Sequence, residues 1–254
     1  MKAASIEAAG DRSLNAARLL NDHMDERLVR TRRVFLKSGI LIGGAALVGM
    51  HGMRGAEKEE EQVSPSEDLM REHGVLKRVL LIYDEAIRRM TANQEFPVET
   101  VVDSAKIIRS FIEDYHEKLE ENFLFPRFEK AGQLTDLVKT LRDQHEAGRG
   151  VTDLTLNLAT QKTLKNAAER PRLGNALRQF VRMYNPHEAR EDTVLFPAFR
   201  KIVSANEYAS LGEDFEKKEH ELFGEEGFEK MVDKVTSIEK KLGIYELAQF
   251  TPKI

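Results

Sequence analysis

One 13-residue pattern occurs twice in this chain of 254 residues and decides how the rest of it is interpreted. Residues 116–128 read HEKLEENFLFPRF, and residues 187–199 read HEAREDTVLFPAF. Both copies follow the pattern His-Glu-x-x-Glu-acidic-x-x-Leu-Phe-Pro-x-Phe. An internal repeat of this kind indicates that the body of the chain contains two units of one design.

Each copy of the pattern is preceded by one further histidine, 43 residues before the first copy and 42 before the second. These histidines are His73 and His145. Apolar residues around all four histidines recur at steps of three or four, which is typical of the buried face of a helix. The sequence therefore predicts two helical hairpins, with one histidine on each helix.

The fold class predicted from this pattern is all-α, because no credible run of strands is present. Helices are predicted from residue 66, over 98–128, from 134 and over 173–204, followed by two shorter ones near 205–222 and 226–242. We expect residues 66–204 to form an antiparallel four-helix bundle and residues 205–254 to form a C-terminal helical extension.

The composition limits which kinds of reactive or metal-binding site the chain can contain. The chain has no Cys, which excludes a disulfide scaffold, a thiolate nucleophile, an iron–sulfur cluster and Cys-ligated zinc. Residues 57–254 hold 30 Lys and Arg against 38 Asp and Glu, and this acidic balance argues against nucleic-acid binding. Any metal ion must therefore be held by histidine and carboxylate.

The N-terminal segment, residues 1–56, is basic instead, with nine Lys and Arg against five Asp and Glu. Residues 31–37 read TRRVFLK, and the apolar run that follows ends at Met50, too short for the ~30 Å core of a bilayer. This stretch closely resembles the twin-arginine export signal. The resemblance implies transport by the twin-arginine translocase to the periplasm or another extracytoplasmic space.

No clear Ala-x-Ala cleavage site follows the apolar run, so removal of the leader and its retention as a membrane anchor both stay open. The acidic residues 57–65 are expected to form a solvated spacer between the leader and the bundle.

Within each copy, the histidine and the glutamate four residues later share one face of the helix. The two pairs are His116 with Glu120 and His187 with Glu191, and apolar neighbours such as Val194 predict that both faces are buried. Six inward polar groups, unpaired at ~1–3 kcal/mol each, would rival the ~5–15 kcal/mol stability of a domain. We therefore expect metal ions to pair them, since two shared carboxylates can bridge two ions inside a bundle.

Here the chain resembles the hemerythrin-like family, also called the HHE cation-binding domain, over about residues 66–204. The resemblance implies a non-haem di-iron centre, oxo- or hydroxo-bridged, in which Glu120 and Glu191 bridge the two iron ions. The terminal ligands it implies are His73, His116, His145 and His187. Manganese and zinc are alternative metals, because nitrogen and oxygen ligands accept them too.

The chain departs from oxygen-carrying hemerythrins at two positions. Those proteins have a second histidine four residues after the third-helix histidine, where this chain has Arg149, and a carboxylate five residues after the last one, here Asp192. We prefer Glu191 as the ligand because it preserves the repeat. The missing imidazole could be replaced by water, Glu117, Glu188 or His220. Otherwise Glu117 and Glu188, about 100° round the helix from the histidines, are expected to be solvated charges.

Two related site types fit less well. A ferritin-like oxidase needs Glu-x-x-His on two helices, but Tyr184 stands where the second glutamate is required. A His-Glu-x-x-His zinc protease is excluded because position 120 is Glu.

Three functions remain open from the sequence. The first is an exported, non-enzymatic di-iron protein that binds or senses O₂ or NO, or holds iron, and it is favoured because no second catalytic motif is present. The second is a redox enzyme at the same centre, acting in peroxide or NO reduction or in iron delivery for iron–sulfur repair. The third is a metal-free or zinc-stabilised structural bundle.

Overall fold

The computed structural model describes residues 63–253, and within them the chain is helical without any strand. The α-helices are α2 (Pro65–Thr91), α3 (Glu99–Ile107), α4 (Glu117–Leu119), α5 (Phe125–Ala131), α6 (Thr135–Leu158), α7 (Gln161–Lys165), α8 (Arg170–Arg190), α9 (Phe196–Ile202), α10 (Ala205–Phe223) and α11 (Gly227–Leu242). Three π-helical segments, η1 (Ile108–His116), η2 (Glu120–Leu124) and η3 (Glu191–Leu195), and a 3₁₀ helix, η4 (Leu247–Phe250), complete them. The predicted all-α fold class is confirmed. The predicted export signal lies outside the described residues.

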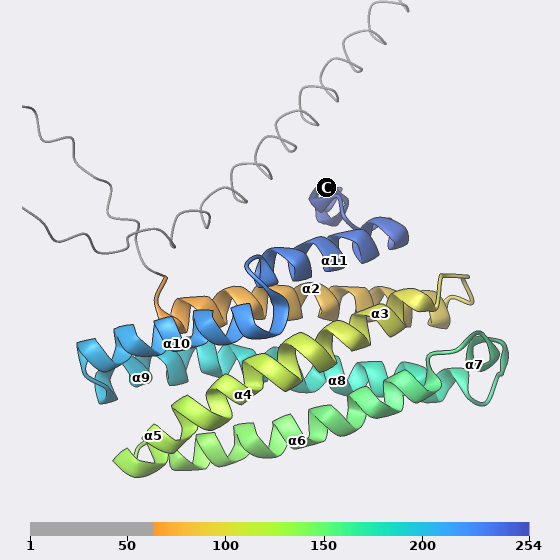
Figure 1. The fold of residues 1–254 in the computed structure, drawn as a ribbon. Helices are drawn as coiled ribbons and strands as arrows, with labels where there is room; N and C mark the ends of the chain where they lie inside the picture. The colour runs from red at the N-terminus through yellow and green to blue at the C-terminus, as the bar shows by residue number, and fades with distance from the viewer. Residues whose placement is uncertain (1–62, 254) are drawn as a thin grey trace, which may run out of the picture. The chain divides into compact units, whose positions relative to one another are not determined.

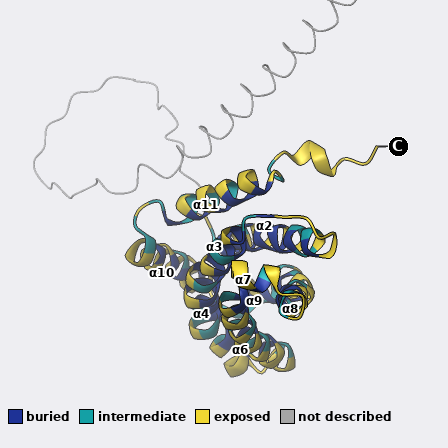
Figure 2. Cartoon of the chain, turned by 90° about the vertical axis from the view of Figure 1, so that its right-hand side faces the viewer, coloured by how far each residue is buried: buried dark blue, intermediate teal, exposed yellow. Residues whose placement is uncertain are grey.

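Four long helical runs form the bundle: α2, α3 to α5, α6, and α8 to α9 (Figure 1). Run α2 packs against α3 and α8, and run α6 packs against the same two neighbours from the other side. The view along the bundle in Figure 2 shows the four runs around a common interior. Helices α10 and α11 cover α2, and α11 also contacts α3. This closed arrangement leaves one interior that all four runs face.

The helix ends follow from local sequence. The Glu67 N–H donates to the Ser64 side chain at 3.4 Å, and Pro65 occupies the first turn, where its missing N–H costs nothing. Helix α2 therefore begins slightly before the predicted start at Ser66. At the other end of the first hairpin, Gly132 adopts the left-handed conformation with φ of 64° and ends α5.

Each copy of the repeated pattern contains a π-helical turn directly before its Phe-Pro pair. Pro126 and Pro197 lack an N–H and would collide with the carbonyl four residues earlier, and a widened turn relieves both problems. The wider turn also changes which residue faces inward: Leu195 is fully buried, whereas Val194 is 38% exposed. The predicted burial of Val194 was therefore wrong.

The interior near the repeats is aromatic. All four phenylalanines of the two Phe-Pro-x-Phe segments are buried: Phe125, Phe128, Phe196 and Phe199. The rings of Phe128 and Phe199 lie 6.0 Å apart between centroids, so the two copies contact each other through equivalent positions. Burying a side chain of this size contributes about 1.5–3 kcal/mol. The repeat thus supplies the contact between the hairpins as well as the polar residues discussed below.

Two surface features complete the description of residues 63–253. No helix in this range has the length and apolar character needed to cross a membrane.

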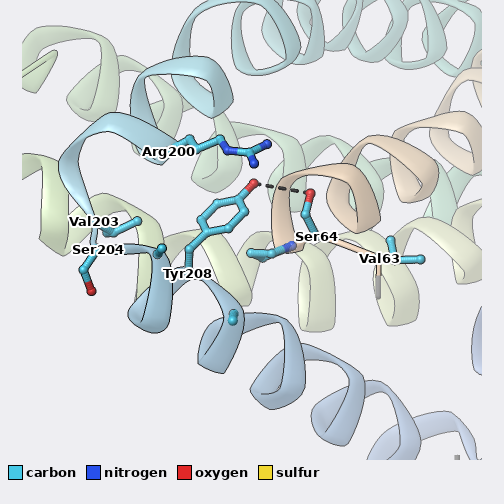
Figure 3. Close-up of a pocket in the computed structure, with 9 residues that line it drawn as sticks. Val63, Ser64, Arg200, Val203, Ser204 and Tyr208 are labelled. Atoms are coloured by element: carbon cyan, nitrogen blue, oxygen red, sulfur yellow. Dashed lines mark hydrogen bonds between the residues drawn. The ribbon is translucent and has the colours of Figure 1, made fainter. Parts of the chain in front are cut away.

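A pocket of about 280 Å³ lies where α9 and α10 meet the start of α2 (Figure 3). The Tyr208 hydroxyl reaches across it to Ser64 Oγ at 3.4 Å. None of the predicted metal ligands lines this pocket.

Candidate metal centre

The four helical runs each place one histidine in the bundle interior. His73 comes from α2, His116 from the end of η1, His145 from α6 and His187 from α8, and none is more than 4% exposed. The two fully buried glutamates of the repeat begin π-helical segments: Glu120 begins η2 and Glu191 begins η3. The structure therefore brings together all six residues that the sequence pattern selected.

These six residues form two triples whose potential ligand atoms lie within 4.8 Å of one another. We call them the first triple (His73, His116 and Glu120) and the second triple (His145, His187 and Glu191). Each triple takes one histidine from each helix of one hairpin and one carboxylate from the repeat, so the duplication in the sequence becomes a duplication of the site.

Glu191 faces both triples. One of its oxygens, Oε1, lies 3.1 Å from His187 Nε2 in its own triple. The other, Oε2, lies 3.4 Å from His73 Nε2 in the first triple. A carboxylate with one oxygen towards each group of donors is placed as a bridging ligand is.

Glu120 also lies near both triples, but through a single oxygen. Its Oε2 lies 3.8 Å from His116 Nε2 in its own triple and 3.5 Å from His145 Nε2 in the second. The two carboxylates therefore link the two triples into one cluster.

The donor atoms of this cluster fit a pair of cations. His116 Nε2 and all four carboxylate oxygens of Glu120 and Glu191 are buried without a hydrogen bond of good geometry. The Nε2 atoms of His145 and His187 face each other at 3.2 Å, about the separation of neighbouring ligands that are each ~2.1 Å from one metal ion. Buried polar atoms without partners are costly, and a shared cation would satisfy all of them.

The other ring nitrogen, Nδ1, of each histidine is held by an acceptor outside the cluster. The pairs are His73 with Asp192 at 2.7 Å, His116 with Glu72 at 2.7 Å, His145 with Glu121 at 3.1 Å and His187 with Gln144 at 2.8 Å. We call these four residues the Nδ1 acceptors. Because those oxygens accept, each imidazole donates from Nδ1, and Nε2 is the nitrogen that faces inward, the usual arrangement behind metal-ligating histidines.

Three of the Nδ1 acceptors were not anticipated from the sequence: Glu72, Gln144 and Glu121. Glu72 and Gln144 directly precede His73 and His145, and Glu121 follows Glu120 at the acidic position of the repeated pattern, so these equivalent places were a readable signal. Asp192 was considered as an alternative ligand to Glu191, but it lies on the outer, Nδ1 side of its histidine.

The expectation that Glu117 and Glu188 are solvated was wrong, because they are 1% and 0% exposed. Glu117 accepts hydrogen bonds from the Tyr184 hydroxyl at 2.6 Å and from Arg149 at 2.7 Å. Both contacts lower the pKa of Glu117, but burial outweighs them and raises it to about 7. Glu188 forms an ion pair with Lys77. A neighbouring helix thus covers each glutamate and supplies its cation. Lys77 lies four residues after His73, and Arg149 lies four residues after His145.

Arg149 occupies the place of the histidine that oxygen carriers have. Besides its contact with Glu117, it donates to Glu121 at 2.6 Å and so helps to hold the Nδ1 acceptor of His145. His220, another candidate substitute, is exposed on α10, while its neighbour Glu219 is buried. The structure therefore does not bring His220 to the cluster.

Without a cation, the imidazoles of the first triple differ in charge. Burial, together with the nearby His73, lowers the pKa of His116 well below its ordinary value. Burial opposes a charge on His73 as well, but the hydrogen bond to Asp192 and the nearby charge of Glu191 outweigh it and raise the pKa of His73 to about 9.

The two carboxylates also differ. Burial and the charge of Glu191 raise the pKa of Glu120 well above its ordinary value. Burial opposes ionisation of Glu191 too, but His187 and His73 hold its pKa well below the ordinary range. Two carboxylates in one buried site do not both ionise unless positive charge is added. The electrostatics of the cluster therefore favour a cation.

The fold and the cluster together define a class: helical bundles with a buried histidine–carboxylate centre of metal-binding type. Residues 64–168 match the family described as "Hemerythrin HHE cation binding domain". Uncharacterized proteins of Mycobacterium tuberculosis and Mycobacterium bovis are 52% identical to the chain over 195 residues, which are 77% of this chain and 76% of theirs. The family match covers the first hairpin and helix α6, and it places these residues with hemerythrin-type cation-binding domains. No solved structure matches it.

Proposed function

We propose that this protein is an exported non-haem di-iron protein that binds or senses a small diatomic ligand such as O₂ or NO. The match of residues 64–168 to a cation-binding domain supports the metal. The observation that carries the proposal is the inward convergence of four imidazoles and two carboxylates whose oxygens lack hydrogen-bond partners. Manganese or zinc in place of iron is an outcome that metal analysis would reveal.

In this proposal the residues divide their roles by position. The histidines of each triple would hold one ion, and Glu120 and Glu191 would be shared between the ions because each faces both triples. Two imidazoles and two shared carboxylates supply fewer donors than the six that octahedral coordination uses. When bound, such an iron pair supplies open positions at which a diatomic molecule coordinates.

Apolar rings keep water away from the cluster and fix the imidazole planes. The Phe125 ring stacks on His145 at 5.5 Å between centroids, and the Phe196 ring stacks on His73 at 5.6 Å. Both phenylalanines occupy the same place in the repeated pattern. A hydrophobic shell of this kind controls the access of solvent to a metal site and its dielectric surroundings.

The test is metal analysis of the purified full-length protein after anaerobic loading with Fe(II), followed by exposure to O₂ or NO. We expect two irons per chain and a stable spectroscopic adduct. Zinc alone, or no metal, would contradict the proposal, and consumption of NO or peroxide without a stable adduct would indicate a redox enzyme instead. The variants His116→Ala and His187→Ala should lose iron, whereas the exposed His220→Ala should keep it.

Export is proposed from the sequence of residues 31–37, which match the twin-arginine signal at every specified position. The partner in this step is the twin-arginine translocase. In the producing organism, replacing Arg32 and Arg33 together by Lys should leave the protein in the cytoplasm, as measured by cell fractionation. An unchanged distribution would contradict export by this route.

A further inference from the structure

We propose that the two triples are unequal, and that the first triple binds its metal ion more tightly than the second. The proposed cause is the pair of residues behind their histidines: a carboxylate, Glu72, behind His116, and a neutral amide, Gln144, behind His187. This inference rests on the proposed metal-binding function and deepens it by assigning two positioning residues.

Glu72 and Gln144 are equivalent by position, so the comparison between them is direct. Each precedes the first histidine of its hairpin, and each reaches across to the histidine of the repeated pattern in the same hairpin. The distances are also alike: Glu72 Oε2 lies 2.7 Å from His116 Nδ1, and Gln144 Oε1 lies 2.8 Å from His187 Nδ1. The two contacts therefore differ in charge rather than in geometry.

The remaining Nδ1 acceptors do not cancel this difference. Asp192 and Glu121 are both carboxylates, so the first triple is backed by two carboxylates and the second by one carboxylate and one amide. Glu121 also shares its charge with Arg149 and Lys118, which both donate to it. That sharing weakens the pull of Glu121 on its histidine and acts in the same direction.

The charge matters because an acceptor behind a ligating imidazole sets the basicity of the inward nitrogen. Hydrogen bonds to an ionised acceptor are about twice as strong as neutral ones, and burial strengthens them further. Glu72 is fully buried. His116 Nε2 is therefore the stronger donor.

The experiment is an anaerobic titration of the metal-free, full-length protein with Fe(II) in competition with a chelator of known affinity. The wild type should fill its sites in two steps that differ in affinity by about 10-fold or more, the scale on which outer partners of ligands act. Glu72→Gln should weaken the first step only, and Gln144→Glu should strengthen the second only. In Glu72→Gln the two steps should therefore have similar, low affinities. In Gln144→Glu they should have similar, high affinities.

Glu146→Gln, at an exposed position on α6, removes the same charge as Glu72→Gln without touching the cluster and should leave both steps unchanged. Mössbauer spectra with one equivalent of ⁵⁷Fe give a second readout: one dominant iron environment in the wild type, and two in Gln144→Glu. Equal steps in the wild type, or no response to Gln144→Glu, would overturn the inference while leaving the proposed function intact. Failure of the wild type to bind any metal would instead overturn the proposed function, and the inference with it.

Discussion

The two hairpins are identical at the centre of the cluster and differ increasingly with distance from it. Both supply two histidines and one glutamate. One layer out, the first hairpin places Glu72 where the second has Gln144. Further out, Lys77 covers Glu188, whereas Arg149 covers the equivalent glutamate of the other copy. In the proposed centre the inner groups must all present donors to the same ions, while the outer groups need only satisfy a neighbour, which several side chains can do.

The largest difference lies beside Gly148. A Cβ at this position would lie 2.2 Å from the Tyr184 hydroxyl oxygen, so only glycine lets that ring approach α6. In the first hairpin the corresponding positions hold Leu76 and Glu113, and Glu113 accepts a hydrogen bond from Thr152 instead. The second hairpin thus has a buried tyrosine hydroxyl at a position where the first has a carboxylate.

The largest expected effect is a difference in iron content between a variant that loses a shared glutamate and one that loses a histidine. Glu191→Gln should reduce iron to below one per chain, because Glu191 faces both triples, whereas His73→Ala should leave about one, because it belongs to the first alone. Iron content measured by elemental analysis checks this. Loss of the same amount of iron from both variants would show that the carboxylate does not link the triples.

The two covering cations should differ next in their effect on stability. The Arg149 side chain is 24% exposed and bonds to two carboxylates, whereas Lys77 is 51% exposed. We expect Arg149→Ala to lower the free energy of unfolding by about 2–3 kcal/mol, since it leaves Glu117 buried without its cation. Lys77→Ala should cost less, about 1–2 kcal/mol, because its ammonium is half exposed, although Glu188 is left buried. Urea unfolding of the metal-free variants measures both, and a larger loss from Lys77→Ala would be inconsistent with this reading.

The last prediction concerns two glycines of α6. Gly148→Ala should displace the Tyr184 hydroxyl from its partner and destabilise the protein by about 1–3 kcal/mol. Gly150→Ala is the matched control: nothing lies within 4 Å of its Cβ, so it should stabilise the helix by about 0.4–1 kcal/mol. Thermal unfolding of both variants compares them, and shifts of the same sign would refute the close approach.

The sequence was sufficient for the fold class and for selecting the residues that meet in the interior. A histidine and a glutamate four positions apart must share a helix face, and the duplication indicated how many helices contribute. The π-helical turns were not predictable from a regular helical period, and they reversed the expected burial of Val194.

The outer layer of the cluster required the structure. Whether Glu117 is solvated depends on which helix packs over it. That helix is α6, whose Arg149 contacts Glu117, and the spacing of residues near Glu117 does not predict this contact. The same holds for Glu72, whose partner lies 44 positions away along the chain. Pattern analysis therefore predicts which faces are buried, while the pairing of buried charges depends on how the helices pack.

The most direct test of the account is the magnetic state of the iron-loaded protein. Mössbauer spectroscopy of the full-length chain loaded with ⁵⁷Fe and oxidised should show two ferric ions per chain that are coupled through their bridges, with a diamagnetic ground state. Isolated paramagnetic iron, or a single iron per chain, would contradict the claim that two triples share one pair of bridging carboxylates.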